Sequence, residues 1–295
     1  MNKAFQPKAI AIVTGAGLKP ATTFFKKGNP ATLIEHAGKP HKMNAASGVA
    51  AVLNGDYHLC VTGYDKGHLD TLSASQLRNP HMTRTVDLQD KAATAAFVEE
   101  VAALKREMNL PVHLIHYGGA SDTTAPLPFG SVFGHTWDMP GEAIPHLVAN
   151  NCTTLLNIAQ AMKRAGIFDD QEITKIVLVS AITALRTKLC HAVDASQKGA
   201  GHSLIRSMAL DLTPERIYLT EVMPGITDTG FYDNPKTLEF LLSSSAAMGY
   251  SYTPDTVPVF GAEVIGEAVE YVLNARAHIR ELSLMPYGQY PQLGA

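Results

Sequence analysis

The sequence predicts a three-layer α/β fold of the Rossmann type, with a doubly wound parallel sheet of about seven strands. The main observation is that short β-branched runs alternate with longer segments of helical periodicity, as in a parallel sheet covered on both faces. The second is composition, because 295 residues that are 46% hydrophobic and 17% charged indicate a globular protein with a large core. No linker, repeat or low-complexity tract divides the chain, so we expect residues 1–295 to form a single domain.

The elements follow from these patterns in chain order. The strands are expected at the short apolar runs Ala9–Val13, His58–Thr62, Thr83–Asp87, Val112–His116, Ile176–Ser180, Ile217–Val222 and Leu282–Pro286. The helices are expected near Gly48–Leu53, Asp90–Met108, Ile144–Arg164, Asp194–Leu212 and Glu263–Arg276. The second helix shows the pattern well, since its apolar residues recur at helical spacing and its charged residues fill the other face.

Composition also excludes several classes of protein. A net charge of -3 provides no basic excess for binding nucleic acid. No run of 18 apolar residues predicts a membrane span, and the first residues do not resemble a signal peptide. The three cysteines are scattered and the histidines form no metal-binding pair, so we expect no metal site and a cytoplasmic protein with reduced thiols.

A glycine-rich turn follows the first strand at Thr14-Gly15-Ala16-Gly17. Glycines at a strand-to-helix turn let the backbone approach a pyrophosphate, although a plain tight turn would use the same residues. The expected helix does not begin here. The chain first runs through residues 18–46, with three prolines, and the helical pattern resumes at Ser47-Gly48.

At this point the chain resembles the short-chain dehydrogenase/reductase family. The family's opening motif is Thr-Gly, three residues, Gly, one residue and Gly, and here it looks split. Gly15 and Gly48 stand 33 positions apart (48 − 15) where the family has four, so 29 residues are inserted, and Ala50 replaces the last glycine. The insertion is rich in lysine, and three interpretations stay open: a solvated surface loop, added positive charge beside the cofactor phosphates, or a lid or oligomer contact.

The resemblance implies a bound NAD or NADP. In the family, an acid at the position of Gly63 selects NAD, and an arginine at the position of Tyr64 pairs with the 2′-phosphate of NADP. Neither residue is present, and together with the basic insertion this favours NADP, although Asp65 remains able to reach the ribose. The expected cofactor contacts are Thr14, Gly15, Gly17, Gly48, Tyr64, Asp87, Gly118, Gly119, Lys198, Pro224, Gly225 and Thr229.

The reaction centre departs from the family's pattern. Lys198 is retained, but Asp194 stands where the proton-donating tyrosine belongs and Ala181 where the serine belongs. An ionised aspartate is a poor proton donor, so Asp194 is either an i,i+4 ion-pair partner of Lys198 or a general base. Asn151, or Asn150 in the alternative register, resembles the helical asparagine of the proton relay. Tyr117 and His191 are the preferred replacement acids among several tyrosines and histidines near the expected site, and Leu238–Ser245 is interpreted as a mobile substrate lid.

Three functions are compatible with these residues. The first is an oxidoreductase that acts on a small carbonyl compound or alcohol with an altered proton donor. The second is a non-redox enzyme, such as an isomerase, dehydratase or cyclase, with Asp194 or a histidine as the base. The third is a non-catalytic nucleotide-binding subunit. By resemblance, we expect a homodimer or homotetramer assembled through the helices around Asn151 and Lys198.

Overall fold

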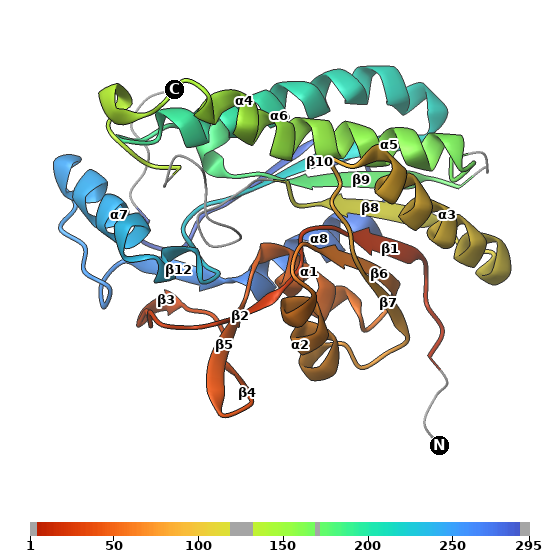
Figure 1. The fold of residues 1–295 in the computed structure, drawn as a ribbon, viewed down its shortest axis with the longest axis horizontal. Helices are drawn as coiled ribbons and strands as arrows, with labels where there is room; N and C mark the ends of the chain where they lie inside the picture. Colours follow the sequence, from red (N-terminus) through yellow and green to blue (C-terminus); the bar gives the residue numbers. More distant parts are fainter. Residues whose placement is uncertain (1–4, 119–131, 169–171, 290–295) are drawn as a thin grey trace.

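The computed structural model describes residues 5–118, 132–168 and 172–289, and its centre is a parallel sheet (Figure 1). The strand order is β13-β10-β9-β8-β1-β6-β7, and every pairing in this sheet is parallel. The strands are β1 (Ile10–Val13), β6 (His58–Gly63), β7 (His81–Thr85), β8 (Val112–His116), β9 (Thr174–Val179), β10 (Ile217–Pro224) and β13 (Glu281–Leu284). The predicted seven-stranded, doubly wound sheet is therefore confirmed.

Helices cover both faces of the sheet and divide the core into two layers (Figure 1). On one face lie α1 (Ala45–Leu53), α2 (Lys66–Gln76) and α8 (Ala262–Asn274), and on the other lie α3 (Lys91–Met108), α5 (Thr154–Arg164) and α6 (Ala192–Leu212). The central strand β1 contributes to both layers, since Ala11 and Val13 pack into the first and Ile10 and Ile12 into the second. Adjacent strand residues point to opposite faces, so a strand buried on both sides is apolar throughout.

The order of the strands reverses beside the first strand. From β1 the chain proceeds to β6 and β7 on one side, and then crosses back to β8 and β9 on the other. In open α/β sheets, ligands bind at the carboxyl ends of the strands where the order reverses. Here that point lies between β1 and β8.

The long helix expected at Ile144–Arg164 is present but contains a wider turn. It consists of α4 (Ala143–Val148), a π-helical turn at Ala149–Thr153, and α5. Asn151 lies in the π turn, a feature that often marks functional positions in helices. Two helices were not expected from the sequence, namely α2 and α7 (Pro235–Ala247), and α7 contains the segment interpreted as a lid. No helix among the described residues has the length and apolar character needed to cross a membrane.

The insertion forms one small sheet and adds a strand to another. Its strands β2 (Leu18–Pro20), β5 (Lys39–Met43) and β4 (Ile34–His36) pair in that order as an antiparallel sheet. Its remaining strand, β3 (Lys27–Asn29), pairs in parallel with β12 (Pro258–Gly261), which in turn pairs with β11 (Thr227–Asp228). The insertion is thereby joined to the segment that follows β10.

Candidate functional site

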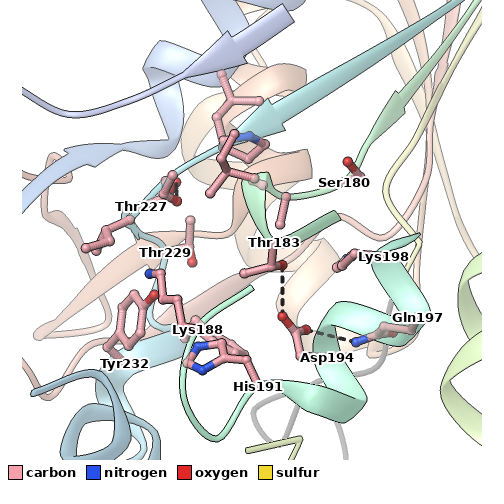
Figure 2. A pocket seen from close by; sticks show the side chains of 18 of the residues that line it. Ser180, Thr183, Lys188, His191, Asp194, Gln197, Lys198, Thr227, Thr229 and Tyr232 are labelled. Atoms are coloured by element: carbon pink, nitrogen blue, oxygen red, sulfur yellow. Dashed lines mark hydrogen bonds between the residues drawn. The ribbon is translucent and has the colours of Figure 1, made fainter. Parts of the chain in front are cut away.

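A cavity of about 110 Å³ opens at the carboxyl ends of β8, β9 and β10, and we call it the reaction pocket (Figure 2). Its polar wall comes from the end of β9, the start of α6 and the turn after β10. The polar residues that line the pocket include Tyr117, Thr183, Lys188, His191, Asp194, Gln197, Lys198 and Thr229. The structure therefore brings together four of the five predicted catalytic residues: Tyr117, His191, Asp194 and Lys198.

Lys198 is a buried cation at the back of the pocket. Its ammonium donates a hydrogen bond to the carbonyl oxygen of Gly118 at 3.1 Å and lies 5.6 Å from the ring centre of Tyr117. Burial lowers the pKa of Lys198, while the negative charges of Asp194 and Glu221 oppose that shift. The ammonium of Lys198 is thus directed at the residues that follow β8.

Asp194 is held in place by two residues that sequence reasoning missed. Its Oδ2 accepts a hydrogen bond from the Thr183 hydroxyl and its Oδ1 from the Gln197 amide, each at 3.1 Å (Figure 2). A carboxylate that accepts on both oxygens is fixed as an acceptor, which suits a base better than an acid. Ala181 offers the pocket only a methyl group, and the neighbouring Ser180 donates instead to the buried Glu221 at 2.5 Å.

Tyr117 and His191, the two preferred replacement acids, line the pocket, but neither has the properties of a good proton donor. Burial raises the pKa of Tyr117 to about 12, and the charge of Asp194 adds to the shift, so its phenol is a weaker acid than usual. Burial lowers the pKa of His191, whose ring packs 4.3 Å from that of Phe133. His191 Nδ1 lies 2.7 Å from the carbonyl oxygen of Leu189, which assigns its proton to Nδ1 and leaves Nε2 as an acceptor.

Lys188 is a pocket residue that the sequence did not indicate. It lies in the loop before α6 and extends toward Thr229 and Tyr232, on the side of the pocket away from Lys198 (Figure 2). Burial lowers the pKa of Lys188 to about 8, and Asp194 partly opposes that shift. A lysine in a loop between a strand and a helix is not part of a periodic sequence pattern. From the sequence alone it cannot be distinguished from a lysine exposed to solvent.

The two parts of the interrupted glycine motif lie next to each other in the structure. Gly17 donates its amide to the Ser47 hydroxyl at 2.7 Å, and this hydroxyl donates to the Gly17 carbonyl at 2.8 Å. Asn44 caps α1 by accepting from the Ser47 amide, and its own side-chain amide donates to the carbonyl of Gly15 at 2.8 Å. Gly15 has φ +79°, and Thr14 accepts a hydrogen bond from the amide of Tyr117 at 3.2 Å. Hydrogen bonds therefore join Gly15 and Gly17, before most of the insertion, to Asn44 and Ser47 at its end.

His116 stabilises the same turn from within the core. Its Nδ1 lies 2.9 Å from the Thr14 hydroxyl and its Nε2 lies 3.1 Å from the Thr154 hydroxyl. Thr154 donates its own proton to the carbonyl of Asn150, so His116 donates from Nε2 and accepts at Nδ1. Burial lowers the pKa of His116 to about 4, and both ring nitrogens are engaged. The geometry indicates a neutral structural residue.

The end of β6 has no room for the acidic side chain that the family can carry at the position of Gly63. A Cβ added at Gly63 would lie 2.3 Å from the carbonyl oxygen of Ala16, so no larger side chain fits there. Tyr64 is exposed, and Asp65 caps α2 by accepting from the His68 amide at 2.8 Å. Lys19 of the insertion lies close enough to Asp65 for their charges to interact, and burial lowers the pKa of Lys19 to about 8. A cation from the insertion therefore lies near Asp65, just after the end of β6.

The remaining predicted residues occupy different environments. A Cβ added at Gly48 would lie 2.3 Å from the carbonyl oxygen of Ala262, so Gly48 allows α1 to pack against α8. Asn151 is fully buried, and its side-chain amide donates to the Gln197 carbonyl at 2.8 Å. Asp87 is exposed after β7 and accepts from the amide of Gln89. Gly119 lies outside the described residues.

The turn after β10 forms the wall of the pocket opposite α6. Pro224, Gly225 and Thr229 all line the pocket. The amide of Gly225 donates to the Leu284 carbonyl at 2.7 Å, which fixes the turn to the last strand of the sheet.

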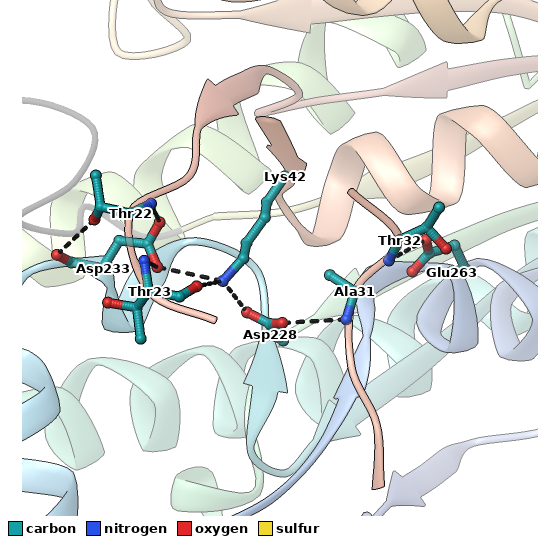
Figure 3. Close-up of polar contacts among 8 residues, drawn as sticks. All are labelled: Thr22, Thr23, Ala31, Thr32, Lys42, Asp228, Asp233 and Glu263. Atoms are coloured by element: carbon teal, nitrogen blue, oxygen red, sulfur yellow. Dashed lines mark hydrogen bonds and ion pairs between the residues drawn. The ribbon is translucent and has the colours of Figure 1, made fainter. Parts of the chain in front are cut away.

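Lys42, a buried lysine of the insertion, contacts this turn (Figure 3). We call the contacts of Lys42 with Asp228, Asp233 and Thr23 the strap. Lys42 Nζ lies 2.6 Å from Asp228 Oδ1 and 3.3 Å from Asp233 Oδ1, and it also donates to the carbonyl of Thr23. Asp228 in turn accepts from the amide of Ala31 at 3.1 Å. Asp228 lies between two residues of the pocket wall, so the strap fixes the wall from outside.

Known proteins identify the class of this molecule. The fold is a three-layer α/β fold of the Rossmann type, and the family described as short chain dehydrogenase matches residues 46–237. The chain belongs to the short-chain dehydrogenase family. The match begins at Ala46, at the end of the insertion, so it does not include β1 or the glycine turn at Thr14–Gly17.

The same fold occurs in solved structures of low sequence identity. An alcohol dehydrogenase from the archaeon Thermococcus sibiricus, complexed with 5-hydroxy-NADP, is 17% identical with a TM-score of 0.64, over 96% of this chain and 98% of the other. A 3-oxoacyl (acyl-carrier-protein) reductase from Agrobacterium tumefaciens C58, with NADP bound, is 16% identical with a TM-score of 0.67, over 96% and 95%. No curated protein matches the sequence.

Proposed function

We propose that this protein is an NADP(H)-dependent oxidoreductase that acts on a small carbonyl compound or the corresponding alcohol. The observation that carries the proposal is the position of Lys198, a buried cation directed at Gly118 in a pocket that also contains the turn after β10. Family membership and the NADP complexes of the similar structures support it. When bound, the nicotinamide supplies or accepts the hydride, and the chain supplies position and charge.

The residues present fit such a dinucleotide. The glycine turn Thr14–Gly17 lies at the switch point of the sheet, with Gly15 in the left-handed conformation that lets the backbone approach a phosphate. Lys198 would hold the ribose on the nicotinamide side, and Pro224, Gly225 and Thr229 would hold the ring. Lys198 also places a positive charge where the substrate oxygen becomes negative during hydride transfer, which lowers the barrier electrostatically.

NADP is proposed over NAD because of the charges beside β6. Gly63 leaves no room for the acid that would bind a free ribose hydroxyl, whereas Lys19 brings a cation to the same place. A charge-assisted hydrogen bond to a phosphate contributes about 1.5–3 kcal/mol, or roughly a tenfold to hundredfold change in affinity. Replacing Lys19 with Met should weaken NADPH binding by that factor and change NADH binding little.

The test combines binding with turnover. Calorimetry with NADPH and NADH measures affinity for wild type and for Lys19→Met, and Lys39→Met serves as an exposed control within the insertion. The absorbance of NADPH then reports turnover with a panel of aldehydes and ketones. Equal loss of affinity for both cofactors in Lys19→Met would contradict the assignment of the phosphate site, and failure of both cofactors to bind wild type would contradict the function.

A second candidate function rests on Asp194. Because Thr183 and Gln197 fix this carboxylate as an acceptor between two lysines, it is arranged as a general base. Proton abstraction next to a carbonyl would then give isomerisation or elimination without net redox change. Exchange of substrate protons with deuterated water in the absence of cofactor turnover would favour this function.

A further inference from the structure

A continuous chain of hydrogen bonds leads from the reaction pocket to a buried carboxylate. Ser180 lines the pocket (Figure 2), and its hydroxyl donates to Oε1 of Glu221 at 2.5 Å. The other oxygen of Glu221, Oε2, lies 2.5 Å from Nδ1 of His202. Arg206 donates to Nε2 of His202 at 3.2 Å, so the ring proton of His202 is on Nδ1 and is donated to Glu221. Because Glu221 accepts on both oxygens, it is an ionised carboxylate.

The same chain leads outward from Glu221. Glu221 is fully buried and His202 is 8% exposed, whereas the side chain of Arg206 is 61% exposed. A second cavity of about 10 Å³ lies beside Glu221 and Arg206, close to the volume that one water molecule needs. Glu221 is therefore connected both to the reaction pocket and to the solvent side of α6.

The proposed reaction needs a group that exchanges a proton with the substrate oxygen. When an alcohol is oxidised, its carbon loses a hydride and its oxygen loses a proton. Asp194 and Ala181 stand at the positions of the family's tyrosine and serine. Ser180 lines the same pocket, and its hydroxyl is hydrogen-bonded to an ionised carboxylate that can take up a proton.

We propose that Glu221 exchanges the proton that accompanies hydride transfer, and that Ser180 relays this proton between the substrate oxygen and Glu221. This inference rests on the proposed oxidoreductase function. In alcohol oxidation, the C–H bond breaks as its hydride passes to the nicotinamide, and the substrate O–H proton passes to Ser180 Oγ. The original proton of Ser180 passes to Glu221 Oε1, which leaves a carbonyl product and a neutral Glu221. Glu221 then releases its proton to solvent beside Arg206, and reduction follows the same steps in reverse.

His202 is a positioning residue for this relay. Its Nδ1 proton occupies Oε2, so Oε1 is the oxygen that accepts from Ser180. The charge of Glu221 also acts on Lys198, because it opposes the lowering of the lysine pKa by burial. A change at Glu221 therefore affects two groups, whereas removal of the Ser180 hydroxyl tests the relay alone.

The experiment measures a single turnover of alcohol oxidation with NADP, followed by the absorbance of the NADPH formed. The probe is the alcohol that the wild type oxidises fastest among isopropanol, cyclohexanol and benzyl alcohol. A positioned base contributes about 10²–10⁴-fold in rate, so we expect Ser180→Ala to be slower by about that factor. In the Glu221→Gln background, Ser180→Ala should cost nothing further, because the two residues act as one path. Ser196→Ala is the control, because Ser196 is exposed on α6 and donates to the carbonyl of Ala192 within the helix.

Mixtures of ordinary and heavy water distinguish a proton relay from a structural role. Two protons move in the wild-type step, so its rate should depend quadratically on the fraction of deuterium, whereas Ser180→Ala and Glu221→Gln should each give a straight line. A straight line in the wild type, or a slower Ser180→Ala variant that keeps the quadratic dependence, would overturn the relay.

Affinity for NADP and the free energy of unfolding in urea are measured for each variant, so that a loss of cofactor binding or of stability is seen separately. If Ser180→Ala does not fold, Glu221→Gln supplies the test, because Ser180 keeps an acceptor in that variant. A wild-type rate in Ser180→Ala would overturn this inference alone and would favour Asp194 as the base. Failure of the wild type to turn over any alcohol or ketone while it binds NADP would contradict the proposed function as well.

Discussion

Lys42 Nζ and Asp228 Oδ1 lie 2.6 Å apart, and the two side chains are only 1% and 2% exposed. This ion pair joins the insertion to the turn that forms one wall of the reaction pocket (Figure 3). Lys42 also lies 5.4 Å from the ring centre of Phe25, which packs with Ile226 and Leu241. The insertion is thus part of the framework of the pocket.

Removing Lys42 should loosen that wall. Lys42→Met leaves Asp228 buried without its cation, and breaking a buried pair in this way costs about 3–5 kcal/mol. We expect a lower free energy of unfolding in urea and faster proteolysis within residues 226–247. Lys26→Met is the control, because Lys26 pairs with Asp255 at 2.9 Å on the exposed surface. Equal stability of the two variants would contradict this role of the strap.

Neutralising Glu221 should change the pH profile of the enzyme. Burial lowers the pKa of Lys198 and Glu221 raises it, so Glu221→Gln should lower the pKa of Lys198 further. If the reaction needs the protonated lysine, kcat/KM falls as pH rises through this pKa, and the fall should begin at lower pH in the variant. Glu281→Gln is a matched control, because exposed Glu281 lies opposite Glu221 on the neighbouring strand β13. An unshifted profile in Glu221→Gln would contradict this coupling.

Substitutions at the adjacent positions 63 and 64 should affect cofactor selectivity differently. Tyr64 is 64% exposed, so Tyr64→Arg can place a guanidinium beside a 2′-phosphate without disturbing the core. We expect roughly tenfold tighter binding of NADPH and unchanged binding of NADH, measured by calorimetry. Gly63→Asp should weaken both cofactors and lower stability, because the carbonyl of Ala16 occupies the space that the new side chain needs. A stable Gly63→Asp variant that prefers NADH would be inconsistent with that steric explanation.

Restoring the family's two missing groups tests whether the nucleotide site is otherwise intact. The double variant Ala181→Ser, Asp194→Tyr supplies a hydroxyl and a phenol on the side of the pocket that contains Lys198. A positioned general acid contributes about 10²–10⁴-fold in rate, so NADPH-dependent reduction of a ketone should increase toward that factor. Ala181→Ser alone should give little gain. Unchanged activity in a double variant that still binds NADPH would indicate that the pocket no longer supports this reaction.

The sequence was sufficient to predict the sheet and much of the pocket. The run Ile10–Val13 is apolar throughout, as a strand buried on both faces must be, and its position before a glycine turn located the switch point. Asp194 and Lys198 were found because their spacing on one helix matches a motif. These features are local, so periodicity and spacing reveal them.

The contacts that tie the pocket together were beyond sequence reasoning. Lys42 and Asp228 are 186 positions apart, and nothing near either residue indicates a partner. Thr183 lies in a single 3₁₀ turn (Ile182–Ala184) and Lys188 in the loop before α6, where side-chain direction depends on tertiary packing. The strands of the insertion were also missed, because they are only three to five residues long and three prolines interrupt the segment.

The central claim is that this chain transfers a hydride between NADP(H) and a carbonyl carbon. The most direct measurement incubates the protein with NADPH carrying deuterium at the nicotinamide C4 and with a panel of ketones and oxo acids, followed by mass spectrometry of the alcohols formed. We expect an alcohol with one deuterium on the carbinol carbon, and we expect Lys198→Met to abolish most of this product. Tight binding of NADPH with no deuterium transferred to any member of the panel would contradict the proposed hydride transfer.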